Sequence, residues 1–296
     1  MSKILEDINN KRKFLFFEVP KFDECMTSWI TRNGLCNYMD FSEYLKKCGL
    51  LYNLNYDFDL NFKQFFNTIV SHNFSYSAYN DFERNHLNFI QIASVKEYKT
   101  IIIPSTTYKK AVQYPLQYCP KCLNSNKPYY SLFWRISLFY GCLKCKCYLL
   151  SGCLKCKYPL QFTKIQADFI YNNKQILKCY SCNYPLNSFS SKTLDIDDYE
   201  ILLWLTNCFF ENGAALEKII SMINLIISNT KVSCCIRKYF KLEQTSGHFS
   251  TLSPEERSLI LKSVFFWFNN QFNTINSINR KNNLTMKNWP NEFIIF

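Results

Sequence analysis

The sequence has no apolar run of the ~18 residues that a membrane-spanning helix requires. Its longest apolar stretches, Ile201–Phe210 and Ile219–Ile227, are shorter and are interrupted by Thr, Asn or Ser. The charged segment Met1–Lys13 also lacks the apolar stretch of a secretory signal peptide. We therefore expect a cytoplasmic, bacterial protein without a membrane partner. In such a reducing compartment, the 15 cysteines should serve as metal ligands and small core residues rather than as disulfides.

Histidine is also scarce. The chain has three histidines, His72, His86 and His248, and none of them begins the His-x-Glu motif of a zinc deaminase. The sequence shows no recognisable pair of nucleophile and general base, and no metal site with an open coordination position. We therefore expect a protein that is not an enzyme.

Cysteine is concentrated in the segment from Cys119 to Cys182. Eight cysteines there form four Cys-x-x-Cys pairs: Cys119/Cys122, Cys142/Cys145, Cys153/Cys156 and Cys179/Cys182. Each pair can present two sulfurs to one Zn²⁺, and a structural Zn²⁺ takes four ligands. The segment therefore predicts two structural zinc ions as cofactors, each with a complete set of sulfur ligands.

Four pairs can share two metal ions in three ways: sequential, crossed or nested. The motif Cys-x-x-Cys-x-Tyr-Pro-Leu begins at Cys153 and again at Cys179, and two copies of one turn are typical of the two halves of a zinc ribbon. This repeat favours one site made of Cys153, Cys156, Cys179 and Cys182, and by elimination a second made of Cys119, Cys122, Cys142 and Cys145. Cys147, a ninth thiol, could replace Cys145, but its spacing from Cys142 is less regular.

Positive charge is concentrated on the same segment. The chain has a net charge of +12, and residues 109–182 carry 11 lysines, one arginine and a single acid, Asp168. Two four-thiolate zinc sites would lower the net charge of this segment from +11 to about +7. A basic surface is expected for a nucleic-acid contact, although these lysines could merely balance the anionic metal sites. The candidate phosphate contacts lie in or beside the Cys pairs: Lys121, Arg135, Lys144, Lys146, Lys155 and Lys157.

Helical patterns surround the cysteine segment. Before it, we predict helices from Asp23, from Asp40 to a stop at Gly49, within Leu60–Val70 and across Tyr79–Ala93. After it, apolar stripes predict helices over 199–210 and 214–228, and Ser253-Pro254-Glu255-Glu256 predicts a capped helix start. The polar stretch Asn269–Asn283 is predicted to be a loop.

These patterns predict a mainly α fold with small zinc ribbons. We expect an N-terminal helical domain over residues 1–108, a tandem zinc-finger module over 109–190 and a C-terminal helical domain over 191–296. The N-terminal helices could contain a helix-turn-helix, but a plain helical bundle has the same sequence signature.

Three parts of the chain resemble the TniQ family, which includes the TnsD-type target selectors of transposons. The opening from Pro20 through Asp23-Glu24 to Ser28-Trp29 is similar to the family's opening motif. Residues 118–160, with Cys119-Pro-Lys-Cys122, Trp134-Arg135 and two further Cys-x-x-Cys pairs, are similar to its zinc core. Trp289-Pro290 with Phe293 is similar to part of its helical region. The family usually has His as the fourth ligand of its first site, where this chain has Cys145.

The resemblance implies N-terminal helices, two zinc fingers with sequential pairing, and C-terminal helices. It also implies a non-catalytic protein that recognises a target as DNA or through an RNA-guided complex and recruits an AAA+ ATPase for transposition. In the family's Trp-Arg pair, Arg135 could pack over the first zinc site instead of touching DNA. The alternatives are a stand-alone zinc-dependent transcription regulator and a zinc-stabilised interaction module without nucleic-acid contact. The protein could also form a homodimer.

Overall fold

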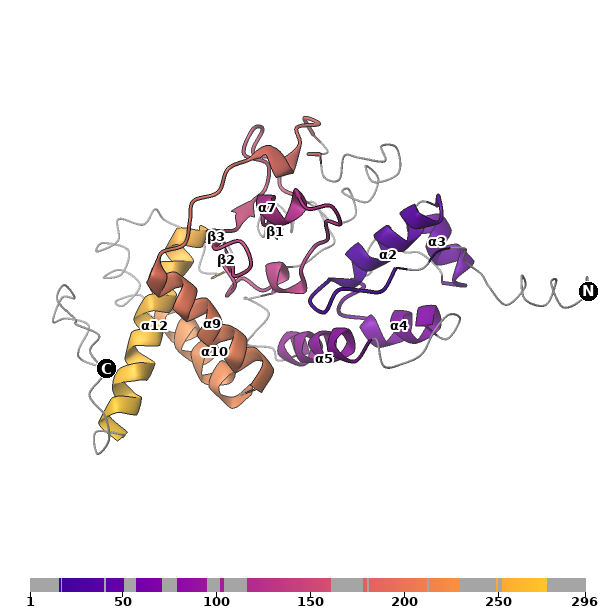
Figure 1. The fold of residues 1–296 in the computed structure, drawn as a ribbon. Coiled ribbons are helices and arrows are strands. Elements are labelled where there is room, and N and C mark those ends of the chain that lie inside the picture. Colours follow the sequence, from indigo (N-terminus) through magenta and orange to yellow (C-terminus); the bar gives the residue numbers. More distant parts are fainter. Residues whose placement is uncertain are drawn as a thin grey trace, which may run out of the picture.

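The computed structural model describes residues 16, 18–39, 41–50, 57–70, 79–94, 102–103, 116–160, 178–179, 181–211, 213–228, 249 and 252–275. Helices dominate, and the described strands are two residues long. The N-terminal helices, the cysteine segment and the C-terminal helices follow one another across the molecule (Figure 1). The prediction of a mainly α fold around two cysteine groups is confirmed. Of the described helices, none has both the length and the apolar composition needed to span a membrane.

The N-terminal part has four described helices: α2 (Met26–Cys36), α3 (Phe41–Lys47), α4 (Phe62–Val70) and α5 (Asn80–Ser94). The Trp29 ring lies at their centre, 5.4 Å from the ring of Phe82 and 6.2 Å from that of Phe66. The α3 helix stops at Gly49, whose φ of +79° closes a Schellman turn in which Leu50 N–H donates to the Leu45 carbonyl. The predicted capping residue Asp40 lies outside the described residues, and the helix-turn-helix stays a prediction.

The described residues of the cysteine segment and of its two flanks form short elements: β1 (Gln117–Tyr118), α7 (Pro120–Leu123), η3 (Leu132–Arg135), β2 (Gly141–Cys142), β3 (Cys147–Tyr148), β4 (Leu150–Ser151) and η4 (Leu186–Ser188). The β1 strand pairs antiparallel with β4, and β2 pairs antiparallel with β3, which sets Cys142 opposite Cys147. Ladders this short are not stable by themselves. The segment must therefore be held by packing and by what its cysteines bind.

The C-terminal part has three described helices: α9 (Ile196–Glu211), α10 (Gly213–Ser228) and α12 (Pro254–Ile275). The predicted capping box is present at α12, where Ser253 N–H donates to the Glu256 carboxylate and Glu256 N–H donates to Ser253 Oγ. The α12 helix continues through residues 269–275, so the predicted loop is wrong there. No Pro or Gly interrupts these residues, and an established helix extends through polar residues at little cost.

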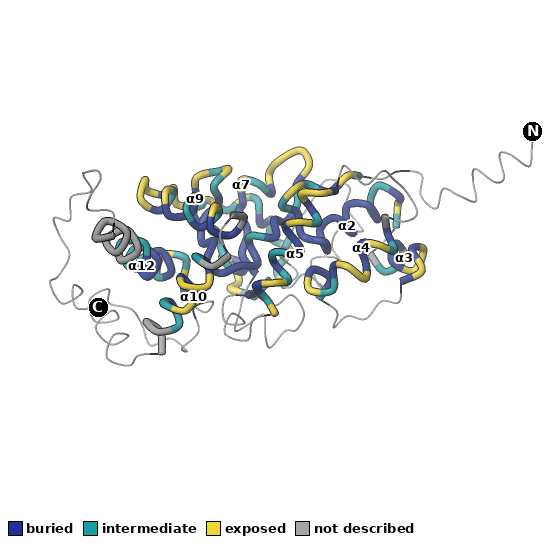
Figure 2. The backbone as a smooth tube through the Cα atoms, turned by 90° about the horizontal axis from the view of Figure 1, so that it is seen from below, coloured by how far each residue is buried: buried dark blue, intermediate teal, exposed yellow. Residues whose placement is uncertain are grey.

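Two hydrophobic cores organise the molecule. One contains the N-terminal aromatic residues around Trp29. The other runs from the end of α5 through the cysteine segment into α9, α10 and α12, and therefore crosses the predicted boundary at residue 190. The side chain of Leu202 packs so closely on β2 that a Cβ at Gly141 would lie 2.6 Å from Leu202 Cδ1. Figure 2 shows buried residues extending through the middle of the molecule between its two helical ends.

Candidate metal centres

The repeated motif folds twice into the same turn. In the first copy, Cys153 N–H donates to the Tyr158 carbonyl at 2.9 Å, and Lys157 N–H donates to the Cys153 carbonyl at 2.8 Å. In the second copy, Cys179 and Asn183 occupy the donor positions of the same two bonds, each 2.8 Å long. The sequence repeat is therefore a repeat of backbone geometry, and each copy directs its two cysteine side chains to one side of the turn.

The two copies face one another and form the second candidate metal centre. The Sγ atoms of Cys153 and Cys182 lie 3.7 Å apart, and those of Cys156 and Cys179 lie 3.5 Å apart. All four sulfurs lie within 4.8 Å of one another. A tetrahedral ion with Zn–S bonds of 2.3 Å separates its sulfurs by about 3.8 Å. The sequential pairing is confirmed, and the group fits a four-thiolate metal ion.

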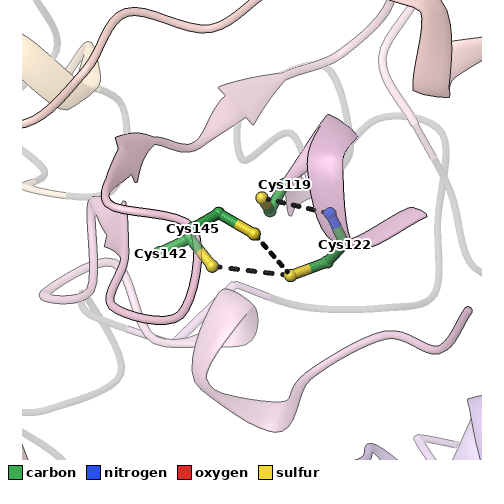
Figure 3. A group of neighbouring side chains, drawn as sticks. All are labelled: Cys119, Cys122, Cys142 and Cys145. Atoms are coloured by element: carbon green, nitrogen blue, oxygen red, sulfur yellow. Dashed lines mark hydrogen bonds between the residues drawn. The ribbon is translucent and has the colours of Figure 1, made fainter. Parts of the chain in front are cut away.

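The first metal centre joins α7 to the turn between β2 and β3. Cys119 caps the N-terminus of α7, and its Sγ accepts a hydrogen bond from Cys122 N–H at 3.4 Å. The Sγ of Cys122 lies 3.6 Å from that of Cys142 and 3.4 Å from that of Cys145 (Figure 3). These four sulfurs also lie within 4.8 Å of one another, as the sequence predicted.

Each group favours the thiolate form of one cysteine and the thiol form of others: hydrogen bonds with the neighbouring thiols raise the pKa of Cys119, and burial raises the pKa of Cys179. Hydrogen bonds from the Cys119 and Cys122 thiols lower the pKa of Cys142 to about 3. Burial acts to raise the pKa of Cys156, but the Tyr158 amide and the neighbouring thiols outweigh it and lower this pKa to about 7. Since metals bind the thiolate form, each group holds a ligand that is ready to bind at neutral pH.

A ninth thiol lies beside the first centre. Cys147 is fully buried, and its Sγ lies 3.7 Å from the Sγ of Cys119. It is not one of the four mutually close sulfurs. The regular spacing favoured Cys145 over Cys147 as the fourth member of the set, and the geometry agrees.

Five of the six candidate phosphate contacts are exposed: Lys121, Lys144, Lys146, Lys155 and Lys157. Within the part of the chain that the structure describes, the ion-paired lysines are Lys127 and Lys262, so the charge of these five is not neutralised by a described acid. Two of these lysines make cation–π contacts with aromatic rings. The Nζ of Lys146 lies 4.9 Å from the ring centre of Tyr199, and that of Lys155 lies 4.8 Å from the ring centre of Tyr184.

Lys192 is a basic residue that the sequence-based set missed. It is exposed, and its Nζ lies 5.8 Å from the ring centre of Tyr148 on β3. A backbone bond from Tyr148 N–H to the Lys192 carbonyl brings it next to the first centre. No signal in the sequence indicated this position, because Lys192 lies outside the Cys-x-x-Cys pairs.

Arg135 is the candidate that the structure corrects. Its side chain is fully buried, and its guanidinium makes a bidentate ion pair with Asp57, at 2.8 and 2.5 Å, and a further ion pair with Asp59. It also donates to the Ile103 carbonyl. A phosphate cannot reach this group, so Arg135 is not a phosphate contact. Arg135 joins the cysteine segment to the N-terminal helices instead.

The other end of the cysteine segment is fixed by Asp198 of α9. This fully buried carboxylate accepts hydrogen bonds from the hydroxyls of Tyr140 and Ser258, at 2.9 and 2.5 Å, and from the hydroxyl of Tyr148. Tyr140 directly precedes β2 and Tyr148 lies on β3, so both are close in sequence to cysteines of the first candidate metal centre. The cysteine segment is therefore bonded to both helical parts of the molecule.

Comparisons with protein-family models, with curated proteins and with solved structures give no match for this chain.

Proposed function

We propose that this chain is a zinc-binding, non-catalytic adaptor that holds the nucleic-acid backbone through the exposed lysines of its two zinc fingers. Each of the two groups of four cysteines would hold one structural zinc ion. Its four sulfurs would fill all four coordination positions of the ion and leave none open for a substrate. The lysines around them would position the protein on phosphates without reading bases.

The observation that carries the proposal is the backbone conformation of Lys146 and Lys157. Each follows the second cysteine of its pair and has a positive φ, 49° for Lys146 and 60° for Lys157. Glycine adopts this conformation freely, whereas a side chain costs about 1 kcal/mol there. Asn183, which occupies the same place in the fourth pair, belongs to a residue type that tolerates it better. Lysine at two strained, exposed positions is best explained by a need for its charge.

The test replaces both lysines with glycine. The double variant Lys146→Gly/Lys157→Gly should unfold at the same or a slightly higher denaturant concentration, because the backbone strain is relieved. Its affinity for duplex DNA should fall on the order of tenfold at 0.15 M salt, and the slope of log K against log salt should flatten by about 1.8. The measurement is fluorescence anisotropy over a salt series, with chemical denaturation in parallel.

The matched control removes two charges elsewhere. Lys63 on α4 and Lys218 on α10 are exposed and lie outside the cysteine segment. The variant Lys63→Ala/Lys218→Ala has the same net charge as the glycine variant and should keep the wild-type salt slope. Equal slopes for wild type and the glycine variant would refute the proposed phosphate contacts.

We further propose that this contact serves target selection for DNA transposition, with an AAA+ ATPase as the recruited partner. This part depends on the resemblance of residues 118–160 and of the opening motif to the TniQ family. The experiment is a pull-down of a purified AAA+ transposition ATPase by the full chain, with and without DNA. ATPase capture that survives the glycine substitutions would favour a pure interaction module, and the absence of capture would favour a stand-alone DNA-binding regulator.

A further inference from the structure

The two metal centres differ in their number of thiols. The second centre has four cysteines and no fifth one among the described residues around it, whereas the first has Cys147 beside its four ligands. The first centre therefore has one sulfur more than a tetrahedral ion can bind. The position and burial of this extra sulfur bear on whether it can also bind the ion.

Cys147 is placed on the metal side of its strand. It is the direct cross-strand partner of Cys142 in the antiparallel β2–β3 pair, and directly opposed residues project their side chains to the same face. The separation of 3.7 Å between the Sγ atoms of Cys147 and Cys119 is close to the ~3.8 Å edge of a four-thiolate zinc site. Cys119, Cys122, Cys142 and Cys147 could thus form an alternative ligand set after a small shift of the ion.

Cys145 and Cys147 differ in how firmly they are held. Cys145 lies in the turn between the strands and is partly exposed, whereas Cys147 is fully buried. The backbone of β3 is fixed on both sides, by its ladder with β2 and by a bridge between Cys147 and Thr193. The ligand that solvent reaches most easily therefore lies next to a protected sulfur of the same chemistry.

We propose that Cys147 is a reserve ligand of the first metal centre, which replaces Cys145 when that thiolate is modified or displaced. The exchange is balanced: Cys147 releases its thiol proton to water as its sulfur binds the ion, and a displaced Cys145 thiolate takes up a proton. The ion keeps its charge and four sulfur ligands throughout. The inference depends on the proposed binding of zinc but not on any contact with DNA.

The test removes one equivalent cysteine ligand from each of the two centres. Cys145 and Cys156 are each the second cysteine of a pair and each accessible to solvent, but only the first centre has a reserve sulfur. We would load the full chains of wild type, Cys145→Ser, Cys156→Ser, Cys147→Ser and Cys145→Ser/Cys147→Ser with Co²⁺. Metal content and the absorption bands of Co²⁺ would then report how many ions are bound and by how many thiolates.

The Cys145→Ser chain should bind two ions with the full four-thiolate absorption of wild type, as should Cys147→Ser. Cys156→Ser and the double variant should each lose four-thiolate absorption from one centre. A three-thiolate spectrum for Cys145→Ser, equal to that of the double variant, would overturn the proposal and leave Cys147 as a mere packing residue.

A second measurement serves if Cys156→Ser fails to fold. Mild alkylation of exposed thiols should release no ion from the first centre of wild type, but should release it from Cys147→Ser, which retains all four primary ligands. Equal release from both chains would also overturn the proposal. A wild-type chain that binds no metal would instead refute the zinc sites themselves, so the two failures are distinguishable.

Discussion

Asp59 is a buried carboxylate whose partners come from three different parts of the chain. It is fully buried, accepts the Met26 N–H at 2.5 Å, pairs with Arg135 and lies 3.3 Å from Nε2 of His86. Burial acts to raise the pKa of Asp59, but Arg135 and then His86 outweigh it and hold this pKa below its ordinary value. The carboxylate therefore joins the start of α2, the middle of α5 and the cysteine segment.

This environment predicts how stability depends on pH. A carboxyl with a lowered folded-state pKa stabilises the fold above its unfolded pKa of about 3.9, and the contribution is lost as pH falls through the folded value. Asp59→Asn should lower the free energy of unfolding by about 3–5 kcal/mol at neutral pH, because the ion pair with Arg135 is broken inside the protein. The difference from wild type should narrow below about pH 4.

Denaturant unfolding at several pH values measures the difference in unfolding free energy between wild type and Asp59→Asn. Any loss of metal at low pH affects both chains and therefore drops out of this difference. Asp81→Asn is the control, because Asp81 forms an exposed pair with Arg84 that should contribute less than about 1 kcal/mol. A constant difference between wild type and Asp59→Asn from pH 7 to pH 3 would contradict the prediction.

Single residues also show what the sequence could and could not predict. The eight cysteines of the two groups were predictable, because Cys-x-x-Cys spacing is local and has few other uses. The role of Arg135 was not, because its partners Asp59 and Asp57 lie 76 and 78 positions away. A basic residue beside a metal site looks the same in sequence whether it faces solvent or a buried carboxylate.

At the level of helices and strands, two glycines are required for different reasons, one for lack of space and one for its backbone conformation. Gly141 on β2 has a close neighbour in Leu202 of α9, at 2.6 Å from an added Cβ, whereas Gly49 after α3 has a positive φ but nothing within 4 Å. Gly141→Ala should cost about 1–3 kcal/mol through overpacking, and Gly49→Ala about 1 kcal/mol through backbone strain.

Chemical denaturation measures both costs. Pairing Gly141→Ala with Leu202→Ala should recover part of the first loss, because the nearer of two crowding side chains is then shortened, while Leu194 Cδ1 and Cδ2 stay 2.9 Å from the new methyl group. The same Leu202 change should not rescue Gly49→Ala. Full additivity of Gly141→Ala and Leu202→Ala would show that Leu202 is not what constrains Gly141, and would leave the constraint to Leu194.

Among the helices and strands, sequence patterns predicted the helices well where local signals were strong. The capping box at Ser253 and the stop at Gly49 are examples, because both depend on neighbouring residues alone. The continuation of α12 to Ile275 was missed, since polar residues without Pro or Gly fit a helix and a loop equally well. The two short ladders could not be predicted, because a two-residue strand has no period to recognise.

Across the whole molecule, the two hydrophobic cores predict a partial response to metal removal. The core of the cysteine segment is shared with α9, α10 and α12, whereas the core around Trp29 is formed by α2 to α5. Chelation should therefore remove hydrogen-exchange protection from residues 116–160 and from α9, and leave more protection in α2 and α4.

Hydrogen exchange of the full chain before and after chelation, read out by mass spectrometry, measures this response. Adding Zn²⁺ back is the control and should restore protection in both regions. Equal loss of protection in all helices would show that the two cores unfold as one unit, and no loss anywhere would show that packing alone holds the cysteine segment.

The ion pair between Asp59 and Arg135 has a consequence for synthesis of the chain. Asp59 leaves the ribosome 76 residues before Arg135. The last N-terminal helix, α5, ends at Ser94, which is 41 residues before Arg135. At about 5–20 residues per second, the complete set of N-terminal helices exists for roughly 2–8 s before the arginine that pairs with their buried carboxylate has been made. During that interval, closing the Trp29 core would bury an uncompensated charge. The nascent N-terminal part should therefore stay open to chaperones until the first metal-binding segment emerges.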